Sequence, residues 1–184
     1  MSDHMTITFW GVRGSYPMPG ASTVHYGGNT PCVEVSVAGQ TIIFDAGTGI
    51  IPLGKELARR SFQSGEAIEA ILLFSHMHHD HTQGFPFFTP TRIPSTRLHI
   101  FGPDIYQRTP EEILSDTMAP PTFPIPFREL SSNRTINSVR ETNVIQIRAD
   151  EGTPIVHRVT NESIKAEKDD IVIRIMRSYA HPGG

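Results

Sequence analysis

An apolar run followed at once by a cluster of histidines is the clearest indication of the fold: Ala70-Ile71-Leu72-Leu73-Phe74, then Ser75-His76-Met77-His78-His79-Asp80-His81-Thr82-Gln83-Gly84. The apolar, partly branched run is typical of a buried strand. The polar cluster therefore falls where a strand leaves its sheet and the chain turns. Imidazole and carboxylate groups are the ligands that zinc and similar divalent ions prefer, so the segment predicts a metal site.

The spacing within the cluster predicts which side chains bind the same metal ion. His76 and His78 are two residues apart, so in extended chain their side chains point the same way and can share one ion. Asp80 and His81 follow at the turn, where they can offer ligands to a second ion. His79 lies between these pairs and is expected to point elsewhere. A chance histidine cluster is the alternative interpretation, but five residues at this spacing behind a buried strand argue against it.

Length and composition limit the classes of protein to consider. The chain has 184 residues, with 38% hydrophobic and 19% charged residues, which fits a single globular domain over 1–184. The sequence has no apolar run of membrane-spanning length, and its polar start leads us to expect no secretory signal. The lone Cys32 is compatible with the cytoplasm. The net charge is −3 and the sequence has no dense Lys/Arg run, so we do not expect a nucleic-acid partner.

Residue periodicity predicts strands separated by a few helices. The expected strands cover 6–10, 32–37, 41–44, 68–74, 98–101, 144–147, 153–159 and 171–176. Helices are expected over 52–63, with Leu53, Leu57 and Ala58 inward, and over 110–118, with Thr109 as the N-cap. Such a mixture predicts a layered α/β or α+β domain.

The His-x-His-x-Asp-His pattern resembles the signature of the metallo-β-lactamase-fold hydrolases. Further segments, from about residue 6 to the end, resemble a bacterial branch described as similar to class II cyclic-nucleotide phosphodiesterases: 9–15 (FWGVRGS), 26–30 (YGGNT), 44–49 (FDAGTG) and 83–88 (QGFPFF). The resemblance implies an αββα sandwich. Because related branches cleave phosphodiesters, it also implies phosphodiester hydrolysis by a metal-bound hydroxide.

The resemblance also implies roles for single residues. Asp45, in an Asp-x-Gly segment, would support the histidine loop by hydrogen bonds. His181, followed by Pro182 and Gly183, would join His76 and His78 around one ion. Asp80 and His81 would bind the other ion, and Asp80 would help to orient the attacking water.

Two loop residues are candidates for substrate contact. Arg13, in the Gly-rich segment 11–28, is placed to meet a phosphate if that segment lies over the site, although an arginine that stabilises loop backbone is at least as good an interpretation. His25 lies in the same segment and is a second candidate.

The pattern departs from the family at the end of the chain. Members continue past the His-Pro-Gly segment and supply a bridging aspartate and a final histidine, whereas this sequence stops at Gly184. The expectation is therefore a C-terminally incomplete sandwich, arising from truncation, from a natural short form or from a one-metal or inactive relative. An uncovered sheet edge and apolar face would invite pairing, so we expect a homodimer or larger assembly.

The leading functional prediction is a metal-dependent hydrolase acting on a phosphodiester or another small-molecule substrate. Zn²⁺ is the first candidate, with one or two ions, and Mn²⁺ or Fe suit the same ligands. A thioester or lactone hydrolase remains an alternative, since the same chemistry attacks acyl carbons. A non-catalytic metal-binding or interaction module is the alternative from another class, because ligands of the second site are missing.

Overall fold

The computed structural model describes residues 4–149, 152–158 and 164–178, and within them nine strands and three α-helices. The strands are β1 (Thr6–Gly11), β2 (Cys32–Val37), β3 (Gln40–Phe44), β4 (Glu69–Leu73), β5 (Arg97–Gly102), β6 (Asn133–Ser138), β7 (Asn143–Ile147), β8 (Pro154–Arg158) and β9 (Ile171–Arg174). The helices are α1 (Ile50–Ser64), α2 (His79–Thr82) and α3 (Pro110–Thr117). Short 3₁₀ turns cover Ala21–Thr23, Phe85–Phe87, Thr89–Arg92 and Phe127–Glu129.

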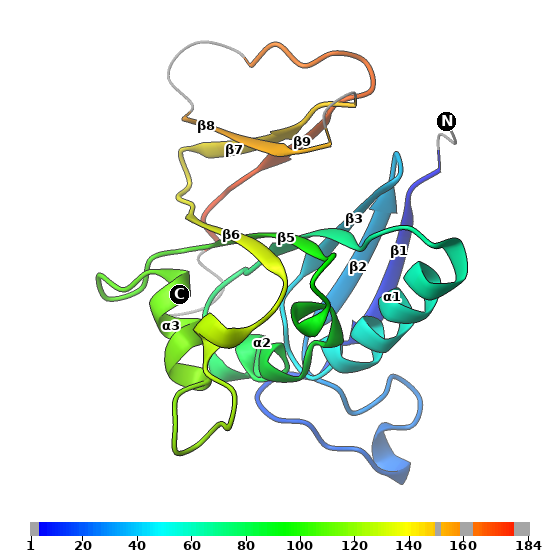
Figure 1. Ribbon diagram of the computed structural model, residues 1–184, viewed down its shortest axis with the longest axis vertical. Coiled ribbons are helices and arrows are strands. Elements are labelled where there is room, and N and C mark those ends of the chain that lie inside the picture. The colour runs from blue at the N-terminus through cyan, green and yellow to red at the C-terminus, as the bar shows by residue number, and fades with distance from the viewer. Residues whose placement is uncertain (1–3, 150–151, 159–163, 179–184) are drawn as a thin grey trace.

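Six strands form one mixed sheet in the order β1-β2-β3-β4-β5-β6 (Figure 1). The first three strands pair antiparallel, whereas β3, β4, β5 and β6 run parallel to one another. Parallel strands end at the same edge of a sheet, which is where open α/β sheets place ligands. The residues that follow β3 and β4 therefore come together at one edge.

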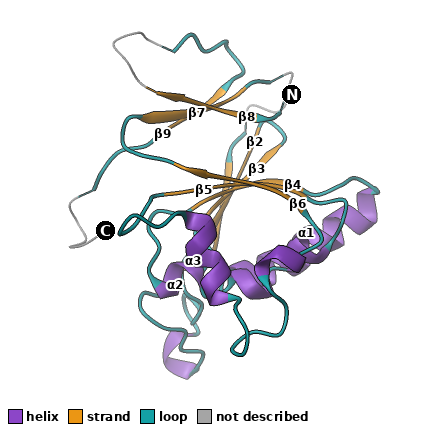
Figure 2. Cartoon of the chain, turned by 60° about the vertical axis from the view of Figure 1, so that its left-hand side comes forward, coloured by secondary structure: helices purple, strands orange, loops and turns teal. Residues whose placement is uncertain are grey.

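The two faces of this sheet are covered differently. Helices α1 and α3 lie on one face, and the antiparallel sheet β8-β7-β9 lies over the other (Figure 2). A buried cluster that includes Ile43, Leu53 and Leu72 fills the helical side, and a second cluster that includes Ile71 and Ile145 joins the two sheets. The predicted α/β class is confirmed. The described residues form three layers, one of helices and two of strands.

Both predicted helices of ordinary length are present with small changes of boundary. Helix α1 begins two residues earlier than expected and ends at Ser64, and its C-cap is Gly65, whose φ of 77° favours glycine. Its buried residues include Leu53 and Leu57, while Ala58 is only half-buried. Thr109 caps α3 as expected: its hydroxyl accepts from the N–H of Glu112, whose carboxylate accepts in return from the N–H of Thr109. This reciprocal arrangement satisfies two amides that a helix start leaves unpaired.

The two edge strands of the large sheet, β1 and β6, carry side chains that are exposed or polar, unlike the buried apolar side chains of the central strands. Strand β6 was not expected from the sequence, because Asn-Arg-Thr-Ile-Asn-Ser is polar and alternates weakly. At the other edge, Ile7 and Phe9 of β1 are 49% and 68% exposed. They pair with Val35 and Val33 on the face that carries the second sheet. An apolar edge of this kind is a site for association, and the homodimer stays a prediction. None of the described helices has the length and apolar character needed to span a bilayer.

Candidate metal centre

The centre is built on the carboxyl ends of β3 and β4. Their register pairs Phe44 with Leu73, so the next residues of the two strands meet at the same edge of the sheet. Asp45 follows β3 and is 7% exposed. Its backbone adopts a left-handed φ of 63°, which aspartate tolerates better than most residues. Asp45 is therefore held beside the chain that leaves β4.

Asp45 supports the histidine loop by three hydrogen bonds from one residue. The N–H of Ser75 donates to Oδ1 at 2.8 Å, and the hydroxyl of Ser75 reaches Oδ2 at 2.8 Å and Oδ1 at 3.0 Å. The N–H of Asp45 donates in turn to the carbonyl of Leu73 at 2.9 Å. These bonds fix where the chain turns after β4, and the supporting role of Asp45 in metal binding stays a prediction.

Three of the predicted ligand histidines lie together at this turn. The ring centroids of His76 and His78 are 4.6 Å apart, and those of His76 and His81 are 4.0 Å apart. The turn that carries Asp80 and His81 is the single helical turn α2, with extended His78 as its N-cap. The helical turn moves His81 back over the strand end, because positions three apart share one helix face. His79 is exposed.

His81 is oriented by the carboxylate behind it. Its Nδ1 lies 2.8 Å from Oδ2 of Asp45, and its Nε2 lies 3.5 Å from Oδ2 of Asp80. Burial opposes a charge on the ring, but the hydrogen bond and the charge of Asp45 outweigh it and raise the pKa of His81. A carboxylate on the rear nitrogen is the usual partner of a metal-binding histidine, because it sets the tautomer and the ring direction.

Asp80 receives a hydrogen bond from the loop that connects β1 to β2. The N–H of Ser15 donates to Oδ2 of Asp80 at 2.8 Å. Ser15 has a φ of 74°, a conformation uncommon for a residue with a side chain. Burial raises the pKa of Asp80, but the Ser15 amide and the neighbouring His81 more than reverse this and lower it. Ser15 was not singled out from the sequence, because only tertiary structure brings it to Asp80.

Close backbone packing joins the supporting segment to the metal-binding segment. The N–H of Ala46 donates to the carbonyl of His81 at 2.8 Å, and the N–H of Gly84 donates to the carbonyl of Ala46 at 2.9 Å. A Cβ on Gly47 would lie 2.4 Å from the carbonyl oxygen of Asp80, and one on Gly84 would lie 2.1 Å from the carbonyl oxygen of Gly47. The glycines after Asp45 and His81 are therefore required by contact rather than by turn geometry.

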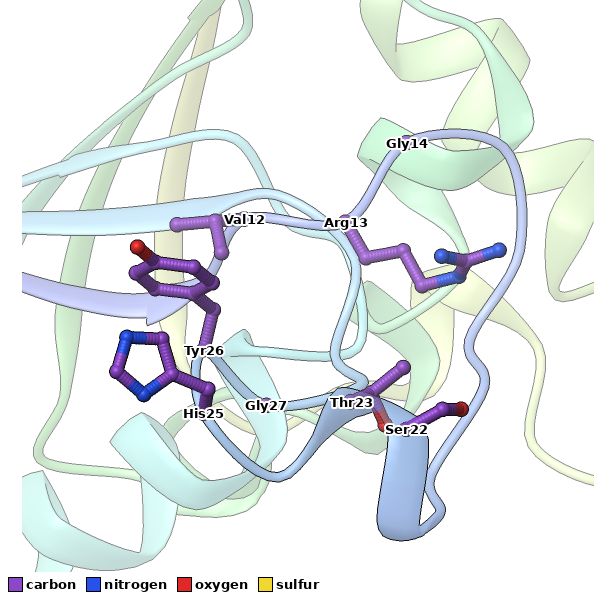
Figure 3. Close-up of a pocket in the computed structure, with 8 residues that line it drawn as sticks. All are labelled: Val12, Arg13, Gly14, Ser22, Thr23, His25, Tyr26 and Gly27. Atoms are coloured by element: carbon purple, nitrogen blue, oxygen red, sulfur yellow. The ribbon is translucent and has the colours of Figure 1, made fainter.

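The other predicted site residues lie in the loop between β1 and β2 or outside the described chain. His181 falls outside the described residues, so its expected place beside His76 and His78 stays a prediction. Arg13 and His25 line a cavity of about 350 Å³ in the loop between β1 and β2 (Figure 3). The Nε of Arg13 donates to the carbonyl of Tyr16 at 3.0 Å, so this arginine does stabilise loop backbone.

The donor set suits a borderline divalent ion. Three imidazoles and one carboxylate lie in one short segment after a strand end, and the carboxylate of Asp45 lies on the far side of His81. Among the described residues, no three His, Cys, Asp or Glu side chains stand in a geometry that holds an ion together. His81 and Asp80 instead make the contacts with Asp45 and Ser15 just described. The chemistry of these donors fits a divalent metal ion.

No protein-family model matches the chain. Ribonuclease Z of Pyrococcus horikoshii is 26% identical over 162 residues, which cover 86% of this chain and 48% of that protein. The chain thus spans about half the length of this curated relative.

Two crystal structures resemble parts of the fold. One is described as a new diphosphatase from the PhnP family, with 16% identity, a TM-score of 0.49, and coverage of 83% of this chain and 61% of that one. The other is the metallo-β-lactamase fold protein YhfI from Bacillus subtilis, with 17% identity, a TM-score of 0.46, and coverage of 76% and 47%.

The similarity to ribonuclease Z extends over most of the described chain, and the histidine motif follows a central parallel strand. The chain therefore resembles the metallo-β-lactamase-fold hydrolases, on the strength of its histidine motif and its similarity to ribonuclease Z.

Proposed function

We propose that this chain belongs to a metal-dependent hydrolase that cleaves phosphodiester bonds. The observation that carries the proposal is the arrangement of Asp80 and His81. Their Oδ2 and Nε2 atoms lie 3.5 Å apart, with Asp45 behind His81 and two further histidine rings alongside. A pair of donors held this way at a sheet edge is suited to bind an ion and leave room for a substrate.

The residues divide into three tasks. His76, His78 and His181 would hold one ion, and Asp80 with His81 would hold a second. A bound Zn²⁺, Mn²⁺ or Fe ion would lower the pKa of a water molecule and neutralise charge on the phosphoryl group. Asp80 would also accept a hydrogen bond from that water and direct it at phosphorus. Asp45 would keep His81 in one tautomer throughout.

The similarity to ribonuclease Z supports a phosphodiester over an acyl substrate. That relative is named for cleaving RNA, and this chain aligns with nearly half of it. Hydrolysis of a thioester or lactone would use the same metal chemistry. The preference for a phosphodiester therefore depends on this similarity, and an assay of both substrate types tests it. The net charge of −3 favours a small substrate or a short strand over a long nucleic acid.

The test compares two chromogenic substrates on protein loaded with Zn²⁺ or Mn²⁺. We expect turnover of bis(p-nitrophenyl) phosphate and little turnover of p-nitrophenyl acetate. His76→Ala should abolish turnover while the thermal unfolding midpoint stays close to that of the parent. His79→Ala is the matched control, because it removes an exposed ring from the same segment, and it should keep full activity.

Three results would contradict the proposal. Turnover of the acetate alone would favour the acyl hydrolase. Full phosphodiesterase activity in His76→Ala would remove the metal role of this histidine. Tight metal binding without turnover of either substrate would favour a non-catalytic metal-binding module.

A further inference from the structure

The N-terminal loop, residues 12–28 between β1 and β2, borders an open cavity of about 350 Å³ beside the candidate metal centre (Figure 3). Backbone bonds from Val12 and Arg13 to the carbonyl of Asn29, at 3.1 and 3.0 Å, hold the base of the loop. A further bond of 2.9 Å joins the N–H of Met18 to the carbonyl of Gly28. The cavity is therefore bounded by an ordered backbone.

The cavity lies next to the centre because residues that line it are adjacent in sequence to a residue that contacts Asp80. Arg13 and Gly14 line it, and the next residue, Ser15, donates its N–H to Asp80 at 2.8 Å. A substrate whose reacting phosphate lies at Asp80 has its attached groups within reach of this loop. A cavity of this volume is in the range that small organic groups occupy.

The side chains of the cavity combine an aromatic surface with a cation. His25 and Tyr26 pack edge to face, with ring centroids 4.3 Å apart, and Tyr26 is 78% exposed. Figure 3 shows the guanidinium of Arg13 on the opposite side of the opening from these two rings. Exposed aromatic rings stack on nucleobases, and a guanidinium pairs with phosphate oxygens.

We propose that the N-terminal loop is a nucleoside-binding subsite, in which Tyr26 stacks on the base and Arg13 contacts an adjoining phosphate. The inference rests on the proposed phosphodiester hydrolysis and names its substrate class: a diester with a nucleoside on at least one side of the scissile phosphate. A purely apolar substituent would use the rings but not the cation. Inorganic phosphate would use the cation but not the rings.

The kinetic test compares two diesters on the metal-loaded protein, thymidine 5′-(p-nitrophenyl phosphate) and methyl p-nitrophenyl phosphate. Tyr26→Ala should raise KM for the thymidine diester about tenfold, within the range for loss of one base–aromatic stack, and leave KM for the methyl diester unchanged. Phe62→Ala removes a 90% exposed ring from the distal end of α1 and should change neither value. Equal effects of Tyr26→Ala on both diesters would overturn the proposal.

A binding measurement separates this proposal from the hydrolytic one. Thymidine 5′-monophosphate is not a diester, so its Kd can be measured by calorimetry without turnover. We expect Tyr26→Ala to raise this Kd about tenfold, as for the KM of the thymidine diester, and Tyr26→Phe to restore it. Arg13→Gln should weaken binding of the monophosphate and not of thymidine itself.

The outcomes divide cleanly between the two proposals. Absence of turnover with both diesters would overturn the hydrolysis, and binding of the monophosphate would then decide the subsite alone. Turnover of both diesters with an unchanged Kd in Tyr26→Ala would overturn the subsite and leave the hydrolysis standing.

Discussion

His81 Nδ1 lies 2.8 Å from Oδ2 of Asp45, and the same carboxylate accepts hydrogen bonds from the backbone and hydroxyl of Ser75. Asp45 thereby joins the carboxyl ends of β3 and β4 and orients a candidate metal ligand at the same time. Since Nδ1 of His81 is occupied, Nε2 faces Asp80. One buried carboxylate thus connects the architecture of the sheet to the geometry of the site.

The first prediction concerns this carboxylate. Asp45→Asn keeps the size of the side chain and tolerates the left-handed backbone, but removes the charge behind His81. We expect zinc affinity, measured by competition with a chromogenic chelator, to fall about 10- to 100-fold, the usual effect of losing such a partner. Asp116→Asn, at an exposed carboxylate in α3, is the control and should bind zinc like the parent. Unchanged affinity in Asp45→Asn would contradict the supporting role.

The second prediction concerns the contact between Gly47 and Asp80. Gly47→Ala would place a methyl group 2.4 Å from the carbonyl oxygen of Asp80 and 2.5 Å from Oγ1 of Thr30. We expect a loss of about 1–3 kcal/mol in the free energy of unfolding, measured by urea denaturation, because the methyl group overpacks a buried contact. Gly20→Ala, which meets no atom within 4 Å, is the control. Equal stability of the two variants would show that α2 moves aside at no cost.

The third prediction concerns the single thiol. Cys32 is fully buried, and burial, followed by the charges of Asp45 and Glu34, raises its pKa well above the ordinary value. Because the thiolate is the reactive form, iodoacetamide should leave Cys32 unmodified in the native protein and alkylate it in denaturant. Mass spectrometry after a timed reaction measures this. Stoichiometric alkylation under native conditions would mean that β2 opens readily.

The fourth prediction concerns acid stability. Hydrogen bonds from Arg59 and Arg60 lower the pKa of Glu56 from 4.5 to about 2. A depressed pKa favours the folded state above pH 4.5, and this contribution is lost as the pH falls toward 2. Glu56→Gln should therefore unfold at a lower temperature than the parent at neutral pH, and the gap should close on acidification. A difference in unfolding temperature that does not change with pH would mean that Glu56→Gln acts through side-chain packing and not through charge.

Several elements of the fold were predictable because their local pattern agrees with their tertiary setting. The apolar run before His76 is a central parallel strand with helices on one face and a second sheet on the other, so every side chain is apolar. Thr109 with Glu112 is a local capping signal and needs no distant partner. By contrast, β6 is polar and joins the sheet only because the edge of β5 is available to it.

The candidate site shows the same division. Short stretches of the amino-acid sequence were sufficient to predict a dense histidine cluster after a strand and an Asp-x-Gly segment to accompany it, because each of these signals is local. Three contacts become evident only in the folded chain: His81 turns back on Asp45, a Cβ on Gly47 would collide with its neighbours, and Ser15 reaches Asp80. Those contacts join segments far apart in the chain, and they arise from the packing of parallel strand ends, which no local pattern encodes.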